Sequence, residues 1–312
     1  MIVVTGATGA LGSQIVAHLL DRVPAERVGV SVRDPARAAD LAARGVRVRR
    51  GDFTDPASLA DAFAGAEQVL VVSANATGGE AVAQHRAAID AARAAGAARI
   101  LYTSHQGASA GSPFAPMPDH AATEGHLAAS GVPFTALRNG FYASTVPLLL
   151  GGALTTGELV APADGPVSWT GHADLAAAAA VVLAGGAALD GTALDGTALD
   201  GTGLDGTGLD GVTPPLTAPD ALDLADVARL LGELTGREVR RVVVDDDEWA
   251  AGLVARGVPA DRAEMLLGMF RASRQGGFAA TGPALADLLG RPVTPLRALL
   301  AEVVAPGARV AP

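Results

Sequence analysis

The first twelve residues constrain the fold of this chain more than any other segment does. A short run rich in β-branched residues, Ile2 to Thr5, is followed by three glycines at a spacing of three, Gly6, Gly9 and Gly12. Leucine, isoleucine and valine then recur at helical spacing through residues 11–22. A strand, a glycine-rich turn and a helix in this order are typical of the first unit of a nucleotide-binding α/β sheet. The alternative is an ordinary strand-to-helix turn.

Each glycine of this turn has a distinct expected task. Gly6 allows the tight turn, Gly9 lets the backbone approach a diphosphate, and Gly12 lets the helix pack closely on the strand. Backbone N–H groups and the positive end of the helix dipole would then hold the phosphates. The expected contacts with the diphosphate are Gly6, Ala7, Thr8, Gly9, Ala10, Leu11 and Gly12.

Strand and helix patterns alternate through the first half of the chain. Strands separated by helices indicate parallel βαβ units, and the apolar run at residues 69–72 fits a sheet that is covered on both faces. The sequence therefore predicts an α/β fold, a Rossmann-like doubly wound parallel sheet with a second, smaller α/β lobe towards the C-terminus. Expected strands are 2–5, 28–32, 46–49, 69–72, 99–103 and 133–137, and expected helices are 11–22, 36–44, 58–64, 81–95 and 120–129.

The pattern loosens after about residue 140. We expect a nucleotide-binding domain at residues 1–150, to which 167–186 returns, and a smaller substrate-capping lobe at 151–312. Expected elements beyond residue 150 are a strand at 167–169, a helix at 173–184, an amphipathic helix at 222–235 that Gly236 ends, a strand at 239–244, and helices at 246–255, 260–273 and 295–304.

A low-complexity tract interrupts this lobe at residues 187–211. Units of Leu-Asp-Gly-Thr followed by Ala or Gly repeat from Leu189, and a fifth copy that starts at Leu209 breaks at Val212. Because Asp-Gly favours turns and each unit offers one apolar side chain, the tract predicts a flexible loop. The alternative is a β-solenoid, for which the copies complete little more than about one coil.

Arg33 follows the second expected strand and lies 21 residues after Gly12. Sites that prefer NAD place an acid at this point, whereas an arginine accommodates the 2′-phosphate of NADP. Arg37 supplies a second cation one helical turn further on, and Asp34 would either pair with Arg37 or repel the phosphate. The sequence thus predicts NADP as the cofactor, and the alternative is ordinary solvated arginines.

Polar side chains follow the other expected strands, at the edge where open α/β sheets bind ligands. Asp52 would bond the amino group of an adenine that Phe53 flanks, although a turn with a core phenylalanine explains the same residues. The remaining candidates for cofactor binding are Ser73, Ala74, Asn75, Thr103, Ser104, Asn139 and Gly140.

Composition excludes several kinds of chemistry. The chain has no cysteine, and its 23 lysine and arginine residues are all arginine, which excludes disulfides, thiolate sites, Schiff bases and the Tyr-x-x-x-Lys pair of short-chain dehydrogenases. A formal net charge of −10 argues against nucleic acid as a partner, and no apolar run reaches the roughly 20 residues that span a membrane. We expect a cytoplasmic protein without membrane insertion, and the sequence is compatible with a homodimer.

Without a lysine-activated tyrosine, reduction of a ketone lacks its usual acid. A quinone needs less acid assistance, since its reduced anion is far less basic than an alkoxide. The candidate catalytic residues are His85, His105, His120 and Tyr142. His120 and Glu124 share a helix face and would form an acid/base pair, with a solvated or capping role for His120 as the alternative. No metal is expected, although His126 would complete a cluster, because no H-E-x-x-H order is present.

The ordered combination of these motifs is more specific than any one of them. It comprises the glycine-rich turn from Thr5, Val32 to Ala38, Gly51 to Asp55, Gln84 and His85, Tyr102 to Ser104, His120 to Glu124, and Leu137 to Tyr142. Together these segments resemble the NmrA-like, atypical short-chain dehydrogenase family, and within it the bacterial NADPH-dependent quinone reductases.

This resemblance implies a Rossmann domain, a small lobe and a quinone pocket between them. It also implies a lysine near the position of His120 in related reductases, where this chain has histidine. Relatives have a strand near Pro214 and Pro215, and because proline cannot donate to a ladder, that strand should be weakened or lost here. NADP contacts are implied at Gly6 to Leu11, Arg33, Ser73 to Asn75 and Asn139 to Tyr142.

The sequence therefore predicts an NADPH-dependent oxidoreductase that transfers a hydride to a quinone or a similar electrophilic small molecule. The alternative is a non-catalytic, NADP(H)-binding redox sensor of the NmrA type. A reductase or isomerase for sugar or polyketide-like substrates is a third interpretation, which the missing acid disfavours.

Overall fold

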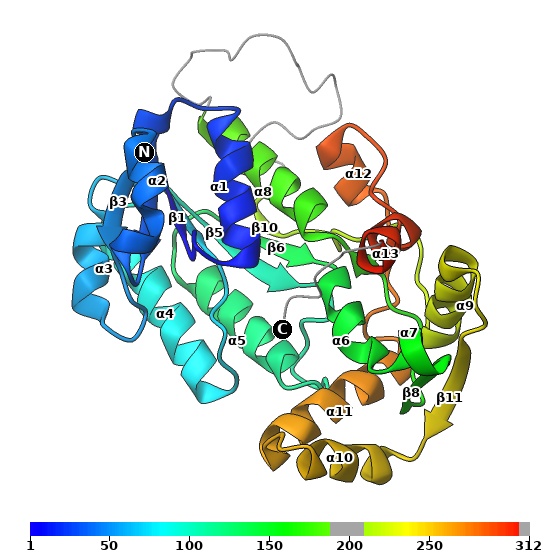
Figure 1. The fold of residues 1–312 in the computed structure, drawn as a ribbon. Helices are drawn as coiled ribbons and strands as arrows, with labels where there is room; N and C mark the ends of the chain where they lie inside the picture. The colour runs from blue at the N-terminus through cyan, green and yellow to red at the C-terminus, as the bar shows by residue number, and fades with distance from the viewer. Residues whose placement is uncertain (188–208, 306–312) are drawn as a thin grey trace.

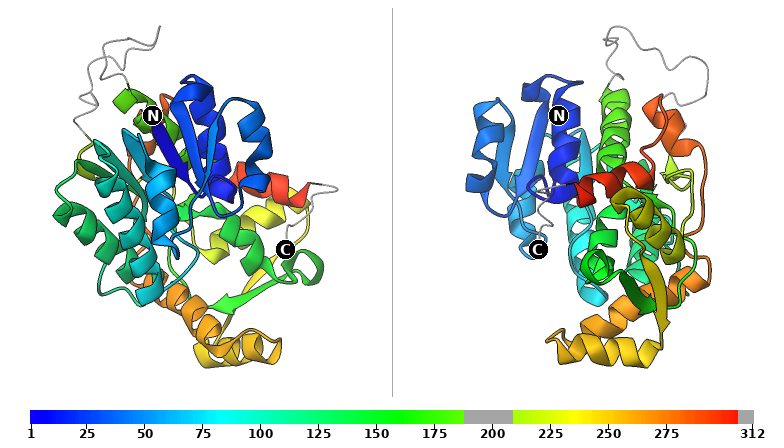
Figure 2. Two further views of the ribbon diagram at one scale, coloured as in Figure 1. Left: turned by 90° about the vertical axis from the view of Figure 1, so that its left-hand side faces the viewer. Right: turned by 45° about the vertical axis from the view of Figure 1, so that its right-hand side comes forward.

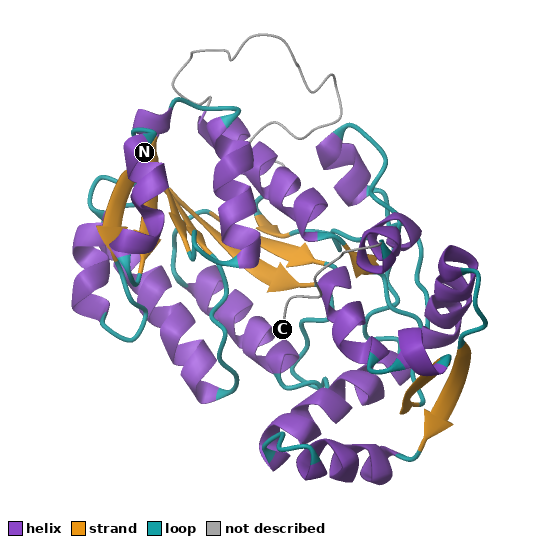
Figure 3. Cartoon of the chain, viewed as in Figure 1, coloured by secondary structure: helices purple, strands orange, loops and turns teal. Residues whose placement is uncertain are grey.

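The computed structural model describes residues 1–187 and 209–305, and its centre is a sheet of seven strands (Figures 1 and 3). The strand order is β10-β6-β5-β4-β1-β2-β3, and every neighbouring pair is parallel. The order reverses between β1 and β4, which is where doubly wound sheets bind ligands. The predicted fold class is confirmed. The strands are β1 (Ile2–Thr5), β2 (Val28–Val32), β3 (Arg47–Arg50), β4 (Gln68–Val71), β5 (Arg99–His105), β6 (Phe134–Asn139) and β10 (Gly211–Val212).

Helices cover both faces of this sheet, as the views in Figure 2 show. Val4 and its neighbour Leu70 share one apolar cluster with Ile15 of α1, while Val3 shares another with Phe63 of α3. Successive strand residues face opposite sides, so a strand covered on both faces must be apolar throughout. The helices are α1 (Ala10–Leu20) and α8 (His172–Ala187) on one face, and α3 (Pro56–Phe63), α4 (Gly79–Ala94) and α5 (Pro116–Ala129) on the other.

A third apolar cluster lies in the smaller lobe and contains Trp169, Phe270 and Phe278. Two small parallel sheets belong to this part, β7 (Phe141–Tyr142) with β9 (Trp169–Thr170), and β8 (Glu158–Pro162) with β11 (Arg240–Val244). The remaining helices are α6 (Val146–Leu150), α7 (Ala153–Thr156), α9 (Leu224–Thr235), α10 (Asp246–Ala255), α11 (Ala260–Arg274), α12 (Ala284–Leu289), which packs against α8, and α13 (Leu296–Val304). No helix in the described ranges is both long and apolar enough to cross a membrane.

Two local predictions need correction. The helix expected at 36–44 is a 3-10 turn, η2 (Pro35–Ala38), followed by the short α2 (Ala39–Ala43), and Gly45 ends it with a φ of 90°. The strand expected at 167–169 forms only as Trp169–Thr170, and it pairs with β7 outside the main sheet. The sequence patterns did not reveal β7, β8, α6, α7, α12 or the 3-10 turns η1 (Ala25–Arg27) and η3 (Ala143–Thr145).

The end of the repeat tract lies in the sheet and not in a loop. Residues 188–208 lie outside the described residues, so the loop expected there stays a prediction. The last copy is described: Leu209 packs against the core, and Thr135 Oγ1 donates a hydrogen bond to its carbonyl oxygen over 2.9 Å. Gly211 and Val212 form β10 beside β6. Thr213 N still donates to Ala136 O over 3.0 Å, and Pro214, which has no N–H, comes next. The strand is two residues long, in keeping with the weakening expected from the prolines.

Candidate functional site

The glycine-rich turn between β1 and α1 has little room for side chains. Gly6 has a φ of 61°, and Gly9 N donates to Gly6 O over 2.9 Å. A Cβ on Gly12 would lie 2.3 Å from that same oxygen. Gly9 is the N-cap of α1 and offers no capping side chain, so no side chain among residues 1–187 and 209–305 caps the first N–H groups of the helix. The turn is therefore a cradle of backbone amides that fits a diphosphate.

The other residues of the turn differ in exposure. Ala7 and Leu11 are buried in the core, so they can offer a ligand only backbone groups. Thr8 is half-buried and Ala10 is exposed at the start of α1. This arrangement agrees with binding through amides and not through side chains.

Arg33 and Arg37 are exposed beside the carboxyl end of β2. In the described ranges, neither guanidinium group makes a hydrogen bond or an ion pair. The carboxylate of Asp34 accepts from Ala36 N over 3.0 Å and so caps the following turn. Both cations are thus available to a phosphate at the surface.

Asp52 and Phe53 form a turn after β3. Asp52 Oδ1 accepts from the N–H and the hydroxyl of Thr54 over 2.9 and 2.8 Å. These hydrogen bonds lower the pKa of Asp52, and the charge of nearby Arg33 lowers it further. Phe53 packs against the cluster beneath α3 and α4. The structure supports the turn with a core phenylalanine, and the adenine contact stays a prediction.

Short polar side chains tie three strand ends together at the carboxyl edge of the sheet. Thr5 Oγ1 accepts from Val72 N over 2.9 Å, which joins β1 to β4. Thr103 Oγ1 accepts from Ser73 N over 2.8 Å and donates to Ser73 Oγ over 3.3 Å, which joins β4 to β5. Two of the predicted cofactor residues, Ser73 and Thr103, therefore lie together at this edge.

The side chain of Ser104 lies on the opposite face of the sheet from that of Thr103. Its hydroxyl donates to Glu124 Oε1 over 2.6 Å, and Arg138 holds both oxygens of Glu124 over 2.9 and 2.7 Å. Neighbouring strand residues point to opposite sides, so Ser104 cannot share the position of Thr103. Glu124 is consequently not paired with His120, and no three histidine, aspartate or glutamate side chains of the described chain are grouped to hold a metal.

His85 is buried beneath the loop that follows β4. Its Nε2 accepts from Ala74 N over 2.9 Å, and its Nδ1 lies 3.0 Å from Thr123 Oγ1. Burial lowers the pKa of His85 to about 4. Both ring nitrogens are engaged within the protein, so His85 holds the loop with Ala74 and has no free nitrogen for a substrate. Asn75 is exposed beyond it.

His105 and His120 lie at the carboxyl end of β5 and on α5, with ring centroids 6.1 Å apart. His120 Nδ1 is 2.7 Å from the hydroxyl of Tyr102, which is fully buried. His105 Nδ1 accepts from Gly107 N over 3.0 Å. Burial lowers the pKa of His105 to about 3 and that of His120 well below its ordinary value. Both rings are therefore neutral near pH 7.

The turn after β6 forms the other side of the site. A Cβ on Gly140 would lie 2.2 Å from Thr170 Oγ1, so only glycine fits there. Asn139 is buried and its side chain hydrogen-bonds Tyr142, whose pKa burial raises. The ring of Tyr142 lies against His172 at the start of α8, with centroids 4.3 Å apart. Asn139, Gly140 and Tyr142 are thus brought together as expected.

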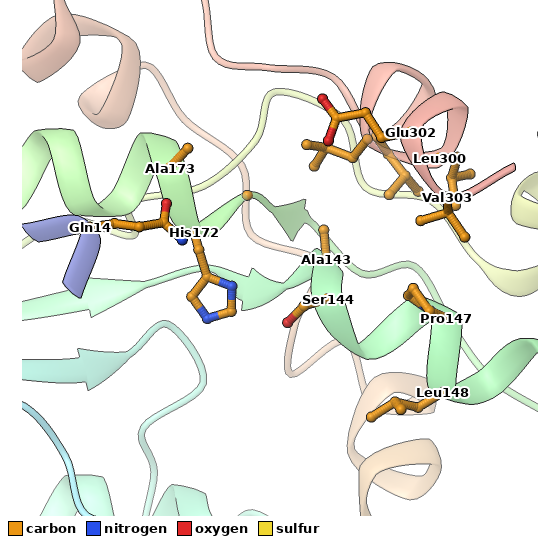
Figure 4. A pocket seen from close by; sticks show the side chains of 13 residues that line it. Gln14, Ala143, Ser144, Pro147, Leu148, His172, Ala173, Leu300, Glu302 and Val303 are labelled. Atoms are coloured by element: carbon orange, nitrogen blue, oxygen red, sulfur yellow. The ribbon is translucent and has the colours of Figure 1, made fainter. Parts of the chain in front are cut away.

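A pocket of about 490 Å³ opens beside His172 (Figure 4). Its walls come from α1, α6, α13 and the first residues of α8, and most of them are aliphatic. The polar side chains among them are Gln14, Ser144, His172 and Glu302. Since His172 also contacts Tyr142, the pocket adjoins the turn after β6. Its size suits a small organic molecule.

Residues 6–185 match the family model described as NAD(P)H-binding. The chain belongs to this family. It is 35% identical over 297 residues to quinone oxidoreductase 2 of Escherichia coli (strain K12), which covers 95% of this chain and 96% of that protein. It is 28% identical to an NmrA-like family domain-containing oxidoreductase of Aspergillus flavus, over 96% of this chain and 94% of that one. The resemblance predicted from the sequence motifs is confirmed.

The fold of this NAD(P)H-binding chain also matches a solved structure over nearly its full length. The crystal structure of the NADPH-dependent quinone oxidoreductase of Escherichia coli in complex with NADPH superimposes with a TM-score of 0.84 and 33% identity. The match covers 97% of this chain and 99% of that one.

Sequence reasoning did not single out Tyr102, Thr123 or His172 as site residues. Tyr102 and Thr123 stood within the motifs that carry the family resemblance, and this was the available signal. Nothing in the pattern around His172 distinguished it from a residue at an ordinary helix start. Its contact with Tyr142 joins positions 30 residues apart, which only the folded chain reveals.

Proposed function

We propose that this chain is an NADPH-dependent oxidoreductase that transfers a hydride to a quinone or a similar electrophilic small molecule. The observation that carries the proposal is the amide cradle at Gly6 to Gly12, with two exposed arginines beyond the next strand. A relative of similar length and fold is a quinone oxidoreductase that binds NADPH. The glycine-rich turn and the two arginines of this chain support the same class of coenzyme.

The residues present fit the diphosphate and the 2′-phosphate of the coenzyme. Gly6 to Gly12 would hold the diphosphate, because a side chain at Gly12 would fill the cradle. Arg33 and Arg37 would hold the 2′-phosphate. When bound, NADPH supplies the hydride. The residues proposed to contact its nicotinamide half are Ser73, Ala74, Asn75, Thr103, Asn139 and Gly140.

An uncharged, planar acceptor suits the surroundings of that end of the sheet. On one side, the aliphatic pocket adjoins Tyr142 through His172. On the other side, His105 contacts the rings of Phe141 and Phe278. Apolar and aromatic walls favour a neutral ring system over a charged or sugar-like substrate. We assign His85 a positioning role, because neither of its nitrogens can reach an acceptor.

We also propose that residues 1–150 together with 167–186 act as the coenzyme-binding domain and that the rest of 151–312 caps the acceptor. The proposed location is the cytoplasm, and a homodimer is proposed only as an oligomeric state with which the sequence is compatible. Analytical ultracentrifugation of the purified chain measures the oligomeric state directly, and a monomer at micromolar concentration would contradict that part of the proposal.

The test is NADPH oxidation by the purified chain with a simple benzoquinone, followed by NADPH absorbance. Arg33→Ala should weaken NADPH binding by roughly 10- to 100-fold and leave NADH binding nearly unchanged, since only NADPH carries the 2′-phosphate. Arg44→Ala, an exposed arginine at the end of α2, is the matched control and should change neither affinity.

Two outcomes would contradict the proposal. An equal loss of NADPH and NADH affinity in Arg33→Ala would show that Arg33 does not bind the 2′-phosphate. Tight NADPH binding without turnover of any quinone would favour the non-catalytic redox sensor over the reductase. Such a sensor should bind NADPH and NADP⁺ with different affinities.

A further inference from the structure

We propose that Tyr102 is a positioning residue that holds His120 in the tautomer with hydrogen on Nε2, so that His105 and His120 present two neutral N–H donors to a carbonyl oxygen at the carboxyl end of β5. The inference deepens the proposed function and rests on it, because this is the end of the sheet where nicotinamide and acceptor would meet. It follows from counting the hydrogens available to a chain of buried hydrogen bonds.

The count begins at His85. Ala74 N donates to His85 Nε2 over 2.9 Å, so this nitrogen carries no hydrogen. The hydroxyl of Thr123 donates to Asp119 O over 2.8 Å, so its oxygen can only accept from His85 Nδ1, 3.0 Å away. His85 is therefore neutral, with its single hydrogen on Nδ1 and directed to Thr123.

The next link is Tyr102. Its hydroxyl lies 3.4 Å from His85 Nδ1 and 2.7 Å from His120 Nδ1. The hydroxyl of Tyr102 also lies within hydrogen-bond reach of Thr123. His85 Nδ1 already carries a hydrogen, and the Thr123 oxygen already accepts that hydrogen, so the nearest remaining acceptor for the phenol hydrogen is His120 Nδ1. The distance agrees, because hydroxyl donors lie near about 2.7 Å whereas N–H donors lie near about 2.9 to 3.0 Å. A neutral His120 then carries its own hydrogen on Nε2.

His105 reaches the same tautomer by a separate contact. Gly107 N donates to His105 Nδ1 over 3.0 Å, which leaves the hydrogen of the neutral ring on Nε2. The two rings are stacked at an interplanar angle of 29°. The two histidines thus have the same protonation pattern, one imposed by a tyrosine and the other by a backbone amide.

Both Nε2 atoms are open to a ligand. Neither has a hydrogen-bond partner in the residues that the structure describes. In that part of the chain, the buried side-chain polar atoms without a partner are Ser31 Oγ, Gln68 Oε1 and Thr217 Oγ1, which do not include the two histidines. His105 and His120 are correspondingly half-buried.

Two neutral N–H donors select an acceptor oxygen that is uncharged or that gains charge during reduction. A preorganised neutral donor stabilises developing negative charge at an oxygen and loses no proton itself. The carbonyl oxygen has two sources here, the carboxamide of the nicotinamide and the quinone. Both have the chemistry that these donors recognise, and the experiment separates them.

The direct test is the tautomer state, measured by long-range ¹H–¹⁵N correlation NMR on the labelled full chain at pH 7. His120→Gln and His105→Gln assign the signals. The wild type should show a protonated Nε2 and a bare Nδ1 for both rings. In Tyr102→Phe, His120 should give signals averaged over two tautomers, while His105, which Gly107 still holds, keeps its pattern as the internal control.

Titration with NADP⁺ alone, and then with a quinone added, identifies the oxygen. A shift of the Nε2–H signals with NADP⁺ assigns the carboxamide, and a shift only after the quinone is added assigns the acceptor. If neither addition moves these signals, the donor role is wrong. These readouts need no turnover, so a chain that reduces no quinone would fail the proposed function and still decide the tautomer.

Kinetics give an independent readout of positioning. Tyr102→Phe should lower kcat with benzoquinone by about 10-fold, because the phenol acts only through His120. In a His120→Gln background the same change should have no further effect. A hydrogen on Nδ1 of His120 in the wild type, or fully additive losses in the double variant, would overturn the inference. The wild-type spectrum decides the first point even if Tyr102→Phe folds poorly.

Discussion

Acid should destabilise this fold over a pH window that its buried histidines define. Burial lowers the pKa of His85 to about 4 and that of His105 to about 3. In the unfolded chain both return to about 6.5. The unfolded state therefore binds more protons than the folded state between these values, so the free energy of unfolding falls as the pH drops below about 6.5. Above that pH the contribution is complete.

The size of the effect follows from the same pKa values. Each pH unit inside the window costs at most about 1.4 kcal/mol per histidine. Between pH 7 and pH 5 this amounts to about 1.9 kcal/mol for one such group and about 3 to 4 kcal/mol for His85 and His105 together. Burial also lowers the pKa of His120 and of His172, which adds in the same direction. The total is a large part of the roughly 5 to 15 kcal/mol that stabilises a typical protein.

Urea unfolding at pH 7, 6 and 5, followed by tryptophan fluorescence, measures this dependence. His105→Leu removes one titrating ring and should flatten the slope by about 1 kcal/mol per pH unit. Phe114→Leu is the matched control, because Phe114 packs in the same aromatic cluster and does not titrate. It should lower stability equally at every pH. Identical slopes for the wild type and His105→Leu would refute the reasoning.

Two further substitutions test the cradle and the buried carboxylate. Gly12→Ala should weaken NADPH binding at least about 10-fold in a fluorescence titration, because its Cβ would lie 2.3 Å from Gly6 O. Gly125→Ala is the control, because the added Cβ meets open space on α5. It should leave NADPH affinity intact and raise the free energy of unfolding by about 0.5 to 1 kcal/mol. Equal NADPH affinities in both variants would contradict the assignment of the cradle. Glu124→Ala should cost about 3 kcal/mol in urea unfolding because it leaves Arg138 and Ser104 without their partner, whereas exposed Glu238→Ala should stay within about 0.5 kcal/mol. Adding Arg138→Met to Glu124→Ala should recover part of that loss, and no recovery would show that the unpaired charge is not its source.

The sequence by itself determined those features of the protein that depend on local patterns. Three glycines between a β-branched run and a helical period predicted the cradle, because no larger residue fits a turn in which Gly12 touches Gly6. The alternation of strand and helix patterns predicted the parallel sheet and its ligand-binding edge. Arg33 was predicted from its distance along the chain to Gly12, and it lies exposed at the end of β2.

What only the tertiary structure decided is which polar groups meet one another. The sequence placed Thr103 and Ser104 together at the rim, yet one bonds Ser73 and the other Glu124, since the pleat turns neighbours to opposite faces. It offered His85 and His120 as equivalent candidates, yet Ala74 and Thr123 occupy both nitrogens of the first while Tyr102 leaves Nε2 of the second open. These contacts join residues from separate elements, and their distances are set by how α4 and α5 pack on the sheet, which no local pattern encodes.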